Sequence, residues 1–407
     1  MNILVANIGS TSFKFRLFSF ADGAERELAS GGVDRIGGDG GVLTYSAGGD
    51  RFRQPRPCAD HGQAIRAALD AMVGKGALES PQSLDAVAFK AVMAGDSEPV
   101  VFVDEKVLAA MEYYAPAAPA HNPAYVAAMR SFGEALAGTP LIAAFEPGFH
   151  RTIPARRRRY AIPAEWESKF GIRRYGYHGA SHRYIAERTA ELMGPAARGV
   201  ISCHLGGSSS LCAIRDGQSV ATSMGFSPQS GLPQSNRVGE FDCFALALVQ
   251  RETHMTLGQM LEALGSAAGL AAMSGTSGDM RDIESAAEGG DEHARLSIDV
   301  FATTVRDALG AYLVELGGAD AVVFTGGIGQ HSPMLRGKAC EGLAFAEIAL
   351  DAEKNASADG ECRIESKKSK TAIWVMPTNE ELIVARQAAA LLGAQRPGAD
   401  FQNTKRG

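Results

Sequence analysis

The sequence lacks several features that would define its class directly. It contains no apolar run long enough to span a bilayer, and its first residues, MNILVANIGS, enter an expected strand without a basic region or a cleavage site. Its 40 basic and 46 acidic residues nearly cancel to a net charge of −6, so neither a nucleic-acid partner nor a membrane partner is expected. The one strongly basic stretch, Arg156 to Arg159, is interpreted as a solvated surface segment.

Cysteine is also scarce. The six cysteines form no C-x-x-C pair and no zinc spacing, and they lie at Cys58, Cys203, Cys212, Cys243, Cys340 and Cys362. Such isolated residues are typical of reduced, partly buried thiols, and we therefore expect a cytoplasmic location.

The length of 407 residues, with 45% hydrophobic content, is too great for one core and predicts at least two domains. Residues 3–33 are expected to form strand, polar turn, strand, Asp-Gly turn and strand, and residues 199–224 repeat this order. After each set of three strands, the sequence predicts helices that alternate with short apolar strands. We expect an α/β fold with two domains, each a mixed sheet flanked by helices. Because identity between the two copies is low, the pattern leaves duplication and coincidence equally open.

Two segments are expected to lie outside the sheets and their helices. Residues 352–370 are polar and predict an exposed excursion, and the tail after Gly393 is expected to be loose.

Four polar, glycine-rich turns are expected to end apolar strands: NIGSTS, HLGGSSS, MSGTSGDMRD and TGGIGQHSP. Glycine allows close approach and left-handed backbone geometry, so the amides of such turns can surround phosphate oxygens. None is followed by the Gly-Lys-Ser/Thr of a P-loop, and any one alone is a common tight turn. Together, the four turns indicate that the protein binds a nucleotide. Ser332 and Pro333 add the start of a helix after the last turn.

His178 and His182 lie four residues apart in YGYHGASHRY, which raises the question of a metal site, a phosphate site or an ordinary helix. Gly176 and Gly179 break a helix, and Ser181 is expected to cap one that starts at His182. His178 would then precede a helix N-terminus, a position that favours an anion.

Charged residues in similar settings are further candidates. Arg237 lies in the polar stretch QSNRVGEFD, and Glu146 follows an apolar strand, where a carboxylate can hold Mg²⁺ through its waters. Thr378 and Glu381 form the pattern of a capping box at the start of the last helix, beside Glu380.

Taken in order along the chain, these stretches resemble the acetate kinase family, within the superfamily of sugar kinases, actin and heat-shock ATPases. The matching stretches are NIGSTSFKF, AHNP, FEPGFHRTIP, RRYGYHGASHRY, CHLGGSSS, TSMGFSPQSGL, SGTSGDMRD, FTGGIGQHS and TNEELIVAR. The resemblance implies two duplicated ribonuclease-H-like (actin-like ATPase) domains with the active site in the cleft between them. These are residues 1–148 plus 378–407, with a returning C-terminal helix, and residues 149–377. It also implies a homodimer, ATP with Mg²⁺, and reversible transfer of the γ-phosphoryl group to a short-chain carboxylate.

Matched position by position, the resemblance implies catalytic roles for Arg237, His178, Glu146 and His121. His178 would hydrogen-bond the transferring phosphoryl group and Arg237 would stabilise its charge. This suits a reaction that depends on positioning and cations. Mg²⁺ would be held by Asn7, Glu146 and Glu380.

The resemblance also implies binding residues. ATP would contact Asn7, Ser12, Lys14, His204, Gly206, Gly207, Ser208, Asp279, Met280, Arg281, Gly327, Ile328, Gly329, Gln330 and His331. The acceptor carboxylate would contact Lys90, Val92, Ala120, Tyr177 and Pro228.

Departures from the family pattern gather around the acceptor. Lys90 stands where the family has arginine, Ala120 where leucine is usual, and Tyr177 where phenylalanine is usual. The space left by Ala120 and the added hydroxyl of Tyr177 predict a carboxylate larger or more polar than acetate, unless neighbouring side chains refill the space and acetate stays preferred. A different class is also open: a nucleotide-dependent regulatory module that has lost transfer activity.

Overall fold

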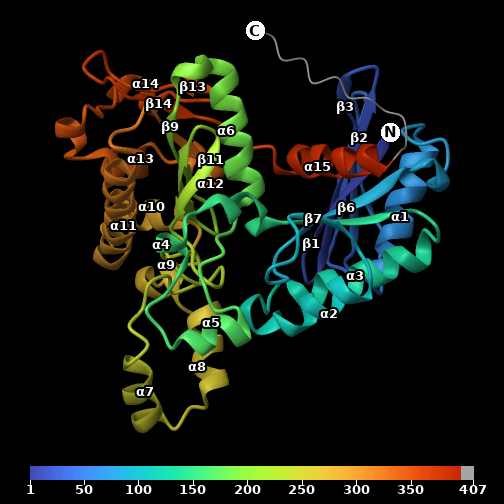
Figure 1. Ribbon diagram of the computed structural model, residues 1–407, viewed down its shortest axis with the longest axis horizontal. Helices are drawn as coiled ribbons and strands as arrows, with labels where there is room; N and C mark the ends of the chain where they lie inside the picture. The colour runs from blue at the N-terminus through green and yellow to red at the C-terminus, as the bar shows by residue number, and fades with distance from the viewer. Residues whose placement is uncertain (396–407) are drawn as a thin grey trace. The chain divides into compact units, whose positions relative to one another are not determined.

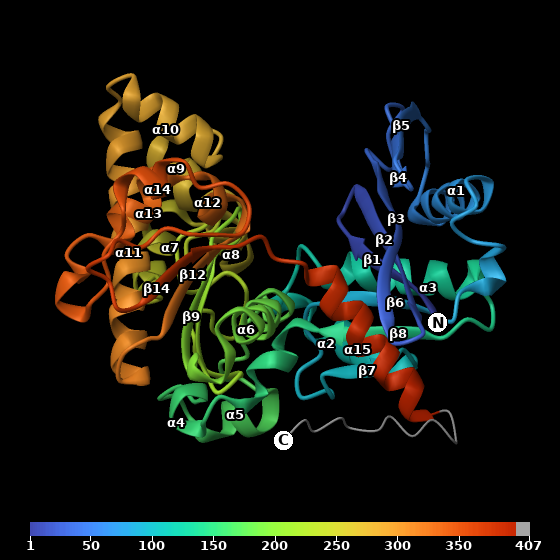
Figure 2. The same ribbon diagram turned by 90° about the horizontal axis from the view of Figure 1, so that it is seen from above.

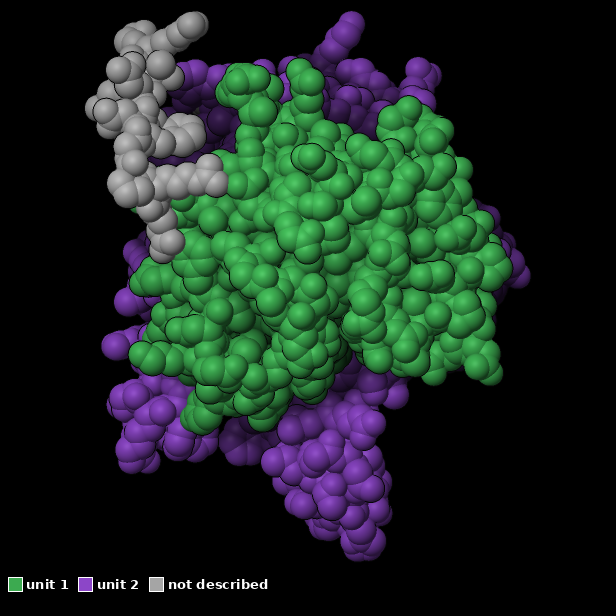
Figure 3. All heavy atoms as spheres, turned by 90° about the vertical axis from the view of Figure 1, so that its right-hand side faces the viewer, with its two compact units in different colours: residues 1–148, 380–407 green, residues 149–379 purple. Residues whose placement is uncertain are grey.

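Three antiparallel strands open each half of the chain, as the two Asp-Gly hairpins predict. The computed structural model describes residues 1–395 (Figure 1). The chain divides into unit 1, Met1–Gly148 with the segment from Glu380, and unit 2, Phe149–Asn379 (Figure 3). A loose tail is expected after Gly393. From residue 396 onward, that tail lies outside the described residues.

Unit 1 contains a mixed sheet of eight strands in the order β5-β4-β3-β2-β1-β6-β8-β7. The strands are β1 (Asn2–Ile8), β2 (Ser12–Ala21), β3 (Ala24–Asp34), β4 (Val42–Ala47), β5 (Asp50–Pro55), β6 (Ala86–Ala91), β7 (Val100–Phe102) and β8 (Leu141–Phe145). Strands β1, β6 and β8 are parallel, and the others pair antiparallel. Ile3, Leu4, Val5 and Ala6 of β1 are all fully buried, so this strand is covered on both faces.

The helices of unit 1 pack on this sheet. They are α1 (His61–Gly74), α2 (Glu105–Tyr113), α3 (Asn122–Ala135) and α15 (Glu380–Gln395). Helix α1 begins where the Asp60 side chain accepts a hydrogen bond from the Gln63 amide at 2.8 Å. Helix α15 packs on β1 and β6, and Ile383, Val384 and Ala385 are buried there.

Unit 2 contains a mixed sheet of six strands in the order β11-β10-β9-β12-β14-β13. The strands are β9 (Gly199–His204), β10 (Ser210–Arg215), β11 (Gln218–Thr222), β12 (Ala321–Thr325), β13 (Cys362–Arg363) and β14 (Ala372–Val375). Its first five strands repeat the order and directions of β3-β2-β1-β6-β8, with β9, β12 and β14 parallel. The common topology supports duplication and confirms the expected fold class.

The helices of unit 2 are α4 (Ala155–Arg158), α5 (Ala164–Phe170), α6 (Gly179–Met193), α7 (Ala245–Thr253), α8 (Leu257–Ser266), α9 (Gly269–Ser274), α10 (Met280–Glu288), α11 (Glu292–Leu316), α12 (Gly326–His331), α13 (Pro333–Cys340) and α14 (Ala352–Ala356). Strand residues alternate between two cores: Ile201 and Val322 pack with α11, whereas Val200 and Val323 pack with α6. Figure 2 shows α11 and α6 on opposite sides of this sheet. Among the described residues, no helix has the length and apolar composition of a membrane span.

One expectation about the segments of unit 2 is wrong and another holds with an exception. The stretch MSGTSGDMRD begins in the last turn of helix α9, which ends at Ser274, and so it follows a helix rather than a strand. Residues 352–370 are mostly exposed, as expected, although they include α14 and β13 and Asn355 is only 8% exposed. The reason is Arg336, whose fully buried guanidinium takes the Asn355 side-chain and main-chain oxygens as acceptors, both at 2.8 Å.

The basic stretch Arg156 to Arg159 lies at the surface but is paired. Arg156 and Arg157 share the carboxylate of Glu315, and Arg159 pairs with Glu167 at 3.0 Å. The expectation for the last helix is wrong in one detail. The buried Thr378 hydroxyl has no hydrogen-bond partner among the described residues, so it forms no capping box.

Candidate active site

In unit 1, polar side chains collect where the parallel strands end. Asn7 lies near the carboxyl end of β1, Lys90 near that of β6, and Glu146 directly follows β8. The carboxyl ends of parallel strands are the usual place for ligands in α/β sheets. The sequence therefore brings three of its predicted site residues to one edge of this sheet.

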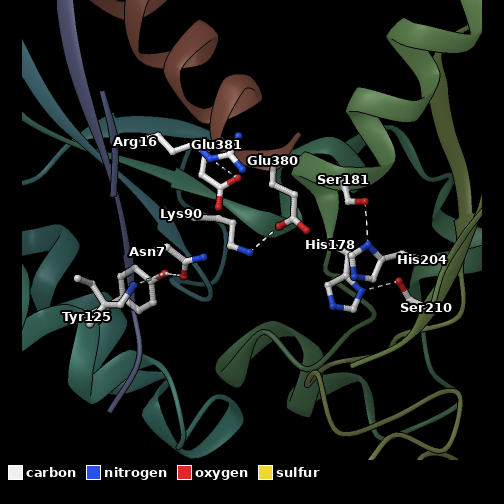
Figure 4. Close-up of polar contacts among 11 residues, drawn as sticks. Asn7, Arg16, Lys90, Tyr125, His178, Ser181, His204, Ser210, Glu380 and Glu381 are labelled. Carbon is white, nitrogen blue, oxygen red and sulfur yellow. Dashed lines mark hydrogen bonds and ion pairs between the residues drawn. The ribbon is translucent and has the colours of Figure 1, made fainter. Parts of the chain in front are cut away.

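Glu380 joins this edge from the first turn of α15. The Lys90 ammonium donates to Glu380 Oε2 at 2.5 Å, and the two side chains are 21% and 13% exposed (Figure 4). Burial alone would lower the pKa of Lys90, but the Glu380 carboxylate, with Glu146 nearby, raises it above its ordinary value. Lys90 is therefore a permanent cation held between carboxylates.

Asn7 is held by a residue that the sequence did not single out. The Tyr125 hydroxyl, from α3, donates to Asn7 Oδ1 at 3.1 Å and accepts from the Ile8 amide at 3.2 Å (Figure 4). Burial raises the pKa of Tyr125 to about 12, so its proton stays in place. The Asn7 side chain is thereby fixed in orientation.

The donor atoms of Asn7, Glu146 and Glu380 suit Mg²⁺, which prefers oxygen ligands and keeps several of its waters. Glu146 is 5% exposed, and the Lys90 ammonium supplies part of the positive charge that so buried a carboxylate needs. Within residues 1–395 no group of three or more His, Cys, Asp or Glu side chains is arranged as a metal cage. The oxygen atoms of these three residues would suit Mg²⁺ that keeps most of its waters.

The remaining candidates of unit 1 lie in the segments after β6 and before α3. His121 directly precedes α3, and Asn122 anchors that helix by donating to the main-chain oxygens of Met93 and Met111, both at 2.7 Å. Val92 is 8% exposed, whereas Ala120 is exposed. The Ala120 side chain therefore lies at the surface of unit 1, accessible to solvent. Ser12 and Lys14 lie on β2 beside β1.

In unit 2, two of the glycine-rich turns lie together at the ends of the parallel strands β9 and β12. The Leu205 carbonyl accepts hydrogen bonds from the amides of Ile328 and Gly329, at 2.9 and 3.1 Å. Gly326 has a φ of +77°, and a Cβ there would lie 2.5 Å from the Leu205 oxygen, so glycine is required. The two predicted phosphate turns thus form one local structure.

Arg237 reaches the first of these turns. Its guanidinium donates to Gln234 Oε1 at 3.2 Å and to Ser208 Oγ at 3.5 Å, and Ser208 itself donates to Gln234 at 2.7 Å. The main chain adds a link, because the Ser235 amide donates to the Gly207 oxygen at 3.0 Å. Burial lowers the pKa of Arg237 from its ordinary value. A largely desolvated cation therefore lies beside the turn expected to bind phosphate.

His178 is placed differently from the expectation. It has a φ of 56° and is itself the residue before α6, which begins at Gly179, so Ser181 is not the cap. A left-handed residue cannot continue a helix, and the helix therefore starts directly after it. His178 remains at a helix N-terminus, as the anion interpretation requires.

The His178 ring is held by neighbours on β9 and β10. It stacks on His204 with centroids 4.2 Å apart, and its Nδ1 lies 2.8 Å from Ser210 Oγ. Ser181 Oγ lies 2.8 Å from His204 Nδ1 (Figure 4). Both histidines are thus fixed by serines.

The other residues expected to contact the nucleotide lie in different surroundings. Asp279 caps α10 and pairs with the exposed Arg281 at 2.6 Å, which lowers the pKa of Asp279 to about 2. Met280 and Ile328 pack in the unit core, so their side chains face inward. Gln330 donates to the Gly326 oxygen at 3.3 Å, and His331 is exposed at the end of α12.

One acceptor candidate, Tyr177, already has a hydrogen-bond partner in the structure. The buried Tyr177 hydroxyl donates to the Phe226 main-chain oxygen at 2.6 Å, so its single proton is already used. A polar substituent of the acceptor could therefore bond to this hydroxyl only by donating to its oxygen. Pro228, also buried, follows in the same segment, where its oxygen accepts from Gln234 at 2.7 Å.

Comparison with known proteins assigns these residues to a family. The model of the acetokinase family matches residues 2–386. The chain belongs to the acetokinase family. An acetate kinase of Clostridium botulinum (strain Kyoto / Type A2) is 39% identical over 391 residues, which cover 95% of this chain and 98% of that relative. An acetate kinase of Geobacillus kaustophilus is 37% identical over 392 residues, covering 96% and 98%.

Solved structures of the acetokinase family agree with the fold. The acetate kinase of Porphyromonas gingivalis superposes with a TM-score of 0.86 at 31% identity, covering 96% of this chain and 99% of that one. A propionate kinase of Francisella tularensis superposes with a TM-score of 0.87 at 31% identity, covering 95% and 98%. The sequence resemblance is thereby confirmed.

Sequence reasoning missed several supporting residues of this acetokinase-family chain. Tyr125, Gln234 and Ser210 hold predicted site residues by hydrogen bonds. The serine run of GGSSS contains Ser210, and the polar stretch QSNRVGEFD begins with Gln234, so both lay inside motifs that the sequence had singled out. Tyr125 lies far along the chain from Asn7 and outside the polar turns.

The buried side chain of His150 predicts that the folded protein loses stability at acid pH. His150 is 1% exposed, bonded to Ser219 Oγ at 2.8 Å and to the Tyr177 oxygen at 2.9 Å. Burial lowers the pKa of His150 to about 4. Its contribution to stability is therefore complete above the unfolded pKa near 6.5 and is lost as pH falls toward 4. The free energy of unfolding that is lost in this way is about 3 kcal/mol.

Urea unfolding between pH 8 and 4.5 tests this expectation. His150→Gln should be less stable at neutral pH but show a shallower fall on acidification than the unaltered protein. The exposed His293→Gln serves as the control and should keep the original slope. An equal slope in His150→Gln would remove His150 as the cause.

Proposed function

We propose that this chain transfers the γ-phosphoryl group of ATP reversibly to acetate or a somewhat larger short-chain carboxylate, giving an acyl phosphate and ADP. The carboxylate-kinase class follows from membership of the acetokinase family. The observation that carries the residue roles is the Arg237 cation, hydrogen-bonded to Ser208 in the glycine-rich turn after β9. Mg²⁺ dependence, a homodimer and a cytoplasmic location belong to the same proposal.

The reaction needs no proton transfer. A carboxylate oxygen of the acceptor attacks the γ-phosphorus, the bond from that phosphorus to the ADP oxygen breaks, and the released electron pair stays on ADP. The protein therefore contributes position and positive charge rather than acid-base chemistry. When bound, Mg²⁺ would neutralise charge on the β- and γ-phosphates.

The roles of the charged residues follow from this chemistry. Arg237 stabilises the charge that spreads over the transferring phosphoryl oxygens, and His178 donates a hydrogen bond to one of them. The Lys90 ammonium has three donors, of which one is used on Glu380, so it can also hold the acceptor carboxylate. Asn7, Glu146 and Glu380 supply the oxygen atoms for the metal.

Trapping the acyl phosphate as a hydroxamate tests the function directly. The purified protein, with ATP and Mg²⁺, should yield hydroxamate with at least one acid of a panel from formate to hydroxybutyrate. The absence of product with every acid, with ATP, other nucleoside triphosphates and pyrophosphate, would refute the proposal. Tight ATP binding under those same conditions would instead support a regulatory module.

The acceptor itself is the subject of a separate prediction. Ala120, where the family usually has leucine, is three carbon atoms smaller, and burying each additional methylene is worth about 0.8 kcal/mol. We therefore expect kcat/KM for propionate or butyrate to exceed that for acetate. The gain should come mainly from chain length, because the Tyr177 proton is donated to Phe226 and only the Tyr177 oxygen remains to accept from a hydroxyl substituent.

Comparing kcat/KM for acetate, propionate, butyrate and their hydroxy derivatives measures this preference. Ala120→Leu should move the ranking toward acetate. The matched control is Ala127→Leu, which makes the same change at an exposed position of α3 and should leave the ranking unaltered. An acetate preference of tenfold or more that Ala120→Leu leaves unaltered would contradict the larger pocket.

A further inference from the structure

A continuous string of histidine and serine side chains runs through unit 2 behind His178. Ser202 Oγ lies 2.8 Å from His182 Nδ1, and His182 Nε2 lies 2.8 Å from Ser210 Oγ. Ser210 Oγ in turn lies 2.8 Å from His178 Nδ1, the contact drawn in Figure 4. Three equal hydrogen bonds thus connect β9, α6 and β10 to the proposed phosphoryl-binding histidine.

This string is sealed from solvent. Ser202, His182 and Ser210 are all 0% exposed, and the rings of His182 and His178 lie with their centroids 6.4 Å apart. Burying three polar side chains is costly unless each is satisfied by the others. The proposed phosphoryl transfer uses none of the three directly, so their placement calls for another role.

Proton counting restricts the string to two arrangements. Burial keeps the pKa of His182 well below its ordinary value, so the ring is neutral and carries one proton. Each serine hydroxyl has one proton to donate. If Ser210 donates to His178 Nδ1, it must accept from His182 Nε2, and His182 Nδ1 then accepts from Ser202. The alternative is the complete reversal of all three bonds.

The two arrangements give His178 opposite chemistry. In the first, a neutral His178 carries its proton on Nε2 and can donate to a phosphoryl oxygen. In the reversed arrangement, neutral His178 carries its proton on Nδ1, and its Nε2 presents a lone pair, which repels an anion. For a neutral His178, only the first suits the proposed function, on which this step rests.

We propose that His182, acting through Ser210, is a positioning residue that fixes the proton of His178 on Nε2 and so makes it a phosphoryl hydrogen-bond donor. Ser202 sets the direction of the string from its far end. His182 does not contact substrate, and its effect is expected on the tautomer and on kcat rather than on ATP binding.

Nitrogen-15 NMR of the histidine-labelled full chain tests the proposal without any turnover. We expect unaltered His178 to show the Nε2-protonated tautomer at pH 7.5, and Ser210→Ala to shift it toward an average of both tautomers. Because a neutral hydrogen bond is worth about 0.5–1.5 kcal/mol, kcat should fall about tenfold in Ser210→Ala, with KM for ATP changed less than about threefold.

Two further variants keep the test decisive. Ser202→Ala, two bonds further from His178, should shift the tautomer in the same direction by less. Ser219→Ala removes a hydroxyl from another fully buried Ser–His pair, Ser219 with His150, and should leave the His178 signal unaltered.

The outcomes separate this inference from the proposed function. An Nδ1-protonated His178, or a tautomer unaffected by Ser210→Ala, would overturn the positioning role even if activity fell. A protein that phosphorylates no acid but shows the expected tautomer shifts would retain the positioning role and lose the proposed function.

Discussion

Arg237→Ala is expected to lower kcat about 10³-fold while changing KM for ATP by less than about threefold. The guanidinium is held by the neutral acceptors Gln234 and Ser208, and no carboxylate partner of Arg237 occurs among the described residues. Its charge is therefore largely desolvated and not neutralised. Such a charge acts most strongly on the transition state, where negative charge spreads over the phosphoryl oxygens.

Steady-state kinetics at saturating acceptor measure this effect. Arg237→Lys should recover only part of the loss, because an ammonium lacks the planar fork of a guanidinium. Arg251→Ala, which removes a side chain 72% exposed, is the matched control and should leave kcat unaltered. A raised KM for ATP with normal kcat would make Arg237 a ground-state binding residue instead.

Lys90→Met is expected to have two opposite effects. The substitution removes the cation between Glu380 and Glu146. Mg²⁺ should then bind the nucleotide-free protein more tightly, because the metal no longer competes with an ammonium 2.5 Å from Glu380. The substitution should also raise KM for the acceptor. A hydrogen bond to a charged group is worth about 1.5–3 kcal/mol, which corresponds to about 10- to 100-fold for each effect.

Calorimetric titration with Mg²⁺ measures the first effect without catalysis, and acceptor kinetics measure the second. Lys338→Met removes an exposed lysine paired with Asp299 at 2.8 Å, and should change neither quantity. If Mg²⁺ affinity in Lys90→Met were equal to or lower than in the unaltered protein, lysine and metal would not compete for Glu380.

Local turn chemistry explains why most of the fold could be predicted. Asp22-Gly23 and Asp216-Gly217 both adopt positive φ at each residue, the geometry of tight hairpins, and so they place the strand triples correctly. Short apolar runs that alternate with helical patterns then predict the strands that follow. These signals depend on neighbours in sequence, and the structure confirms them.

The errors arise where distant residues override local preference. Ser181 has the side chain of a helix cap, yet it faces His204, and the left-handed His178 starts the helix instead. Asn355 lies in a polar segment but is buried by Arg336. The contact of Lys90 with Glu380 joins residues 290 positions apart. A sequence pattern can identify the candidates of such a pair, but not that they touch.

The return of α15 to unit 1 also determines the order in which a ribosome can complete the protein. Residues 149–379 are translated before Glu380, Ile383 and Val384, so most of unit 2 is synthesised while unit 1 still lacks its last helix. During that interval the apolar faces of β1 and β6 that α15 covers are open to chaperones and to aggregation. A nascent chain stopped before Glu380 would carry the complete glycine-rich turns of unit 2 and an unfinished first sheet, in which Lys90 lacks the carboxylate of Glu380.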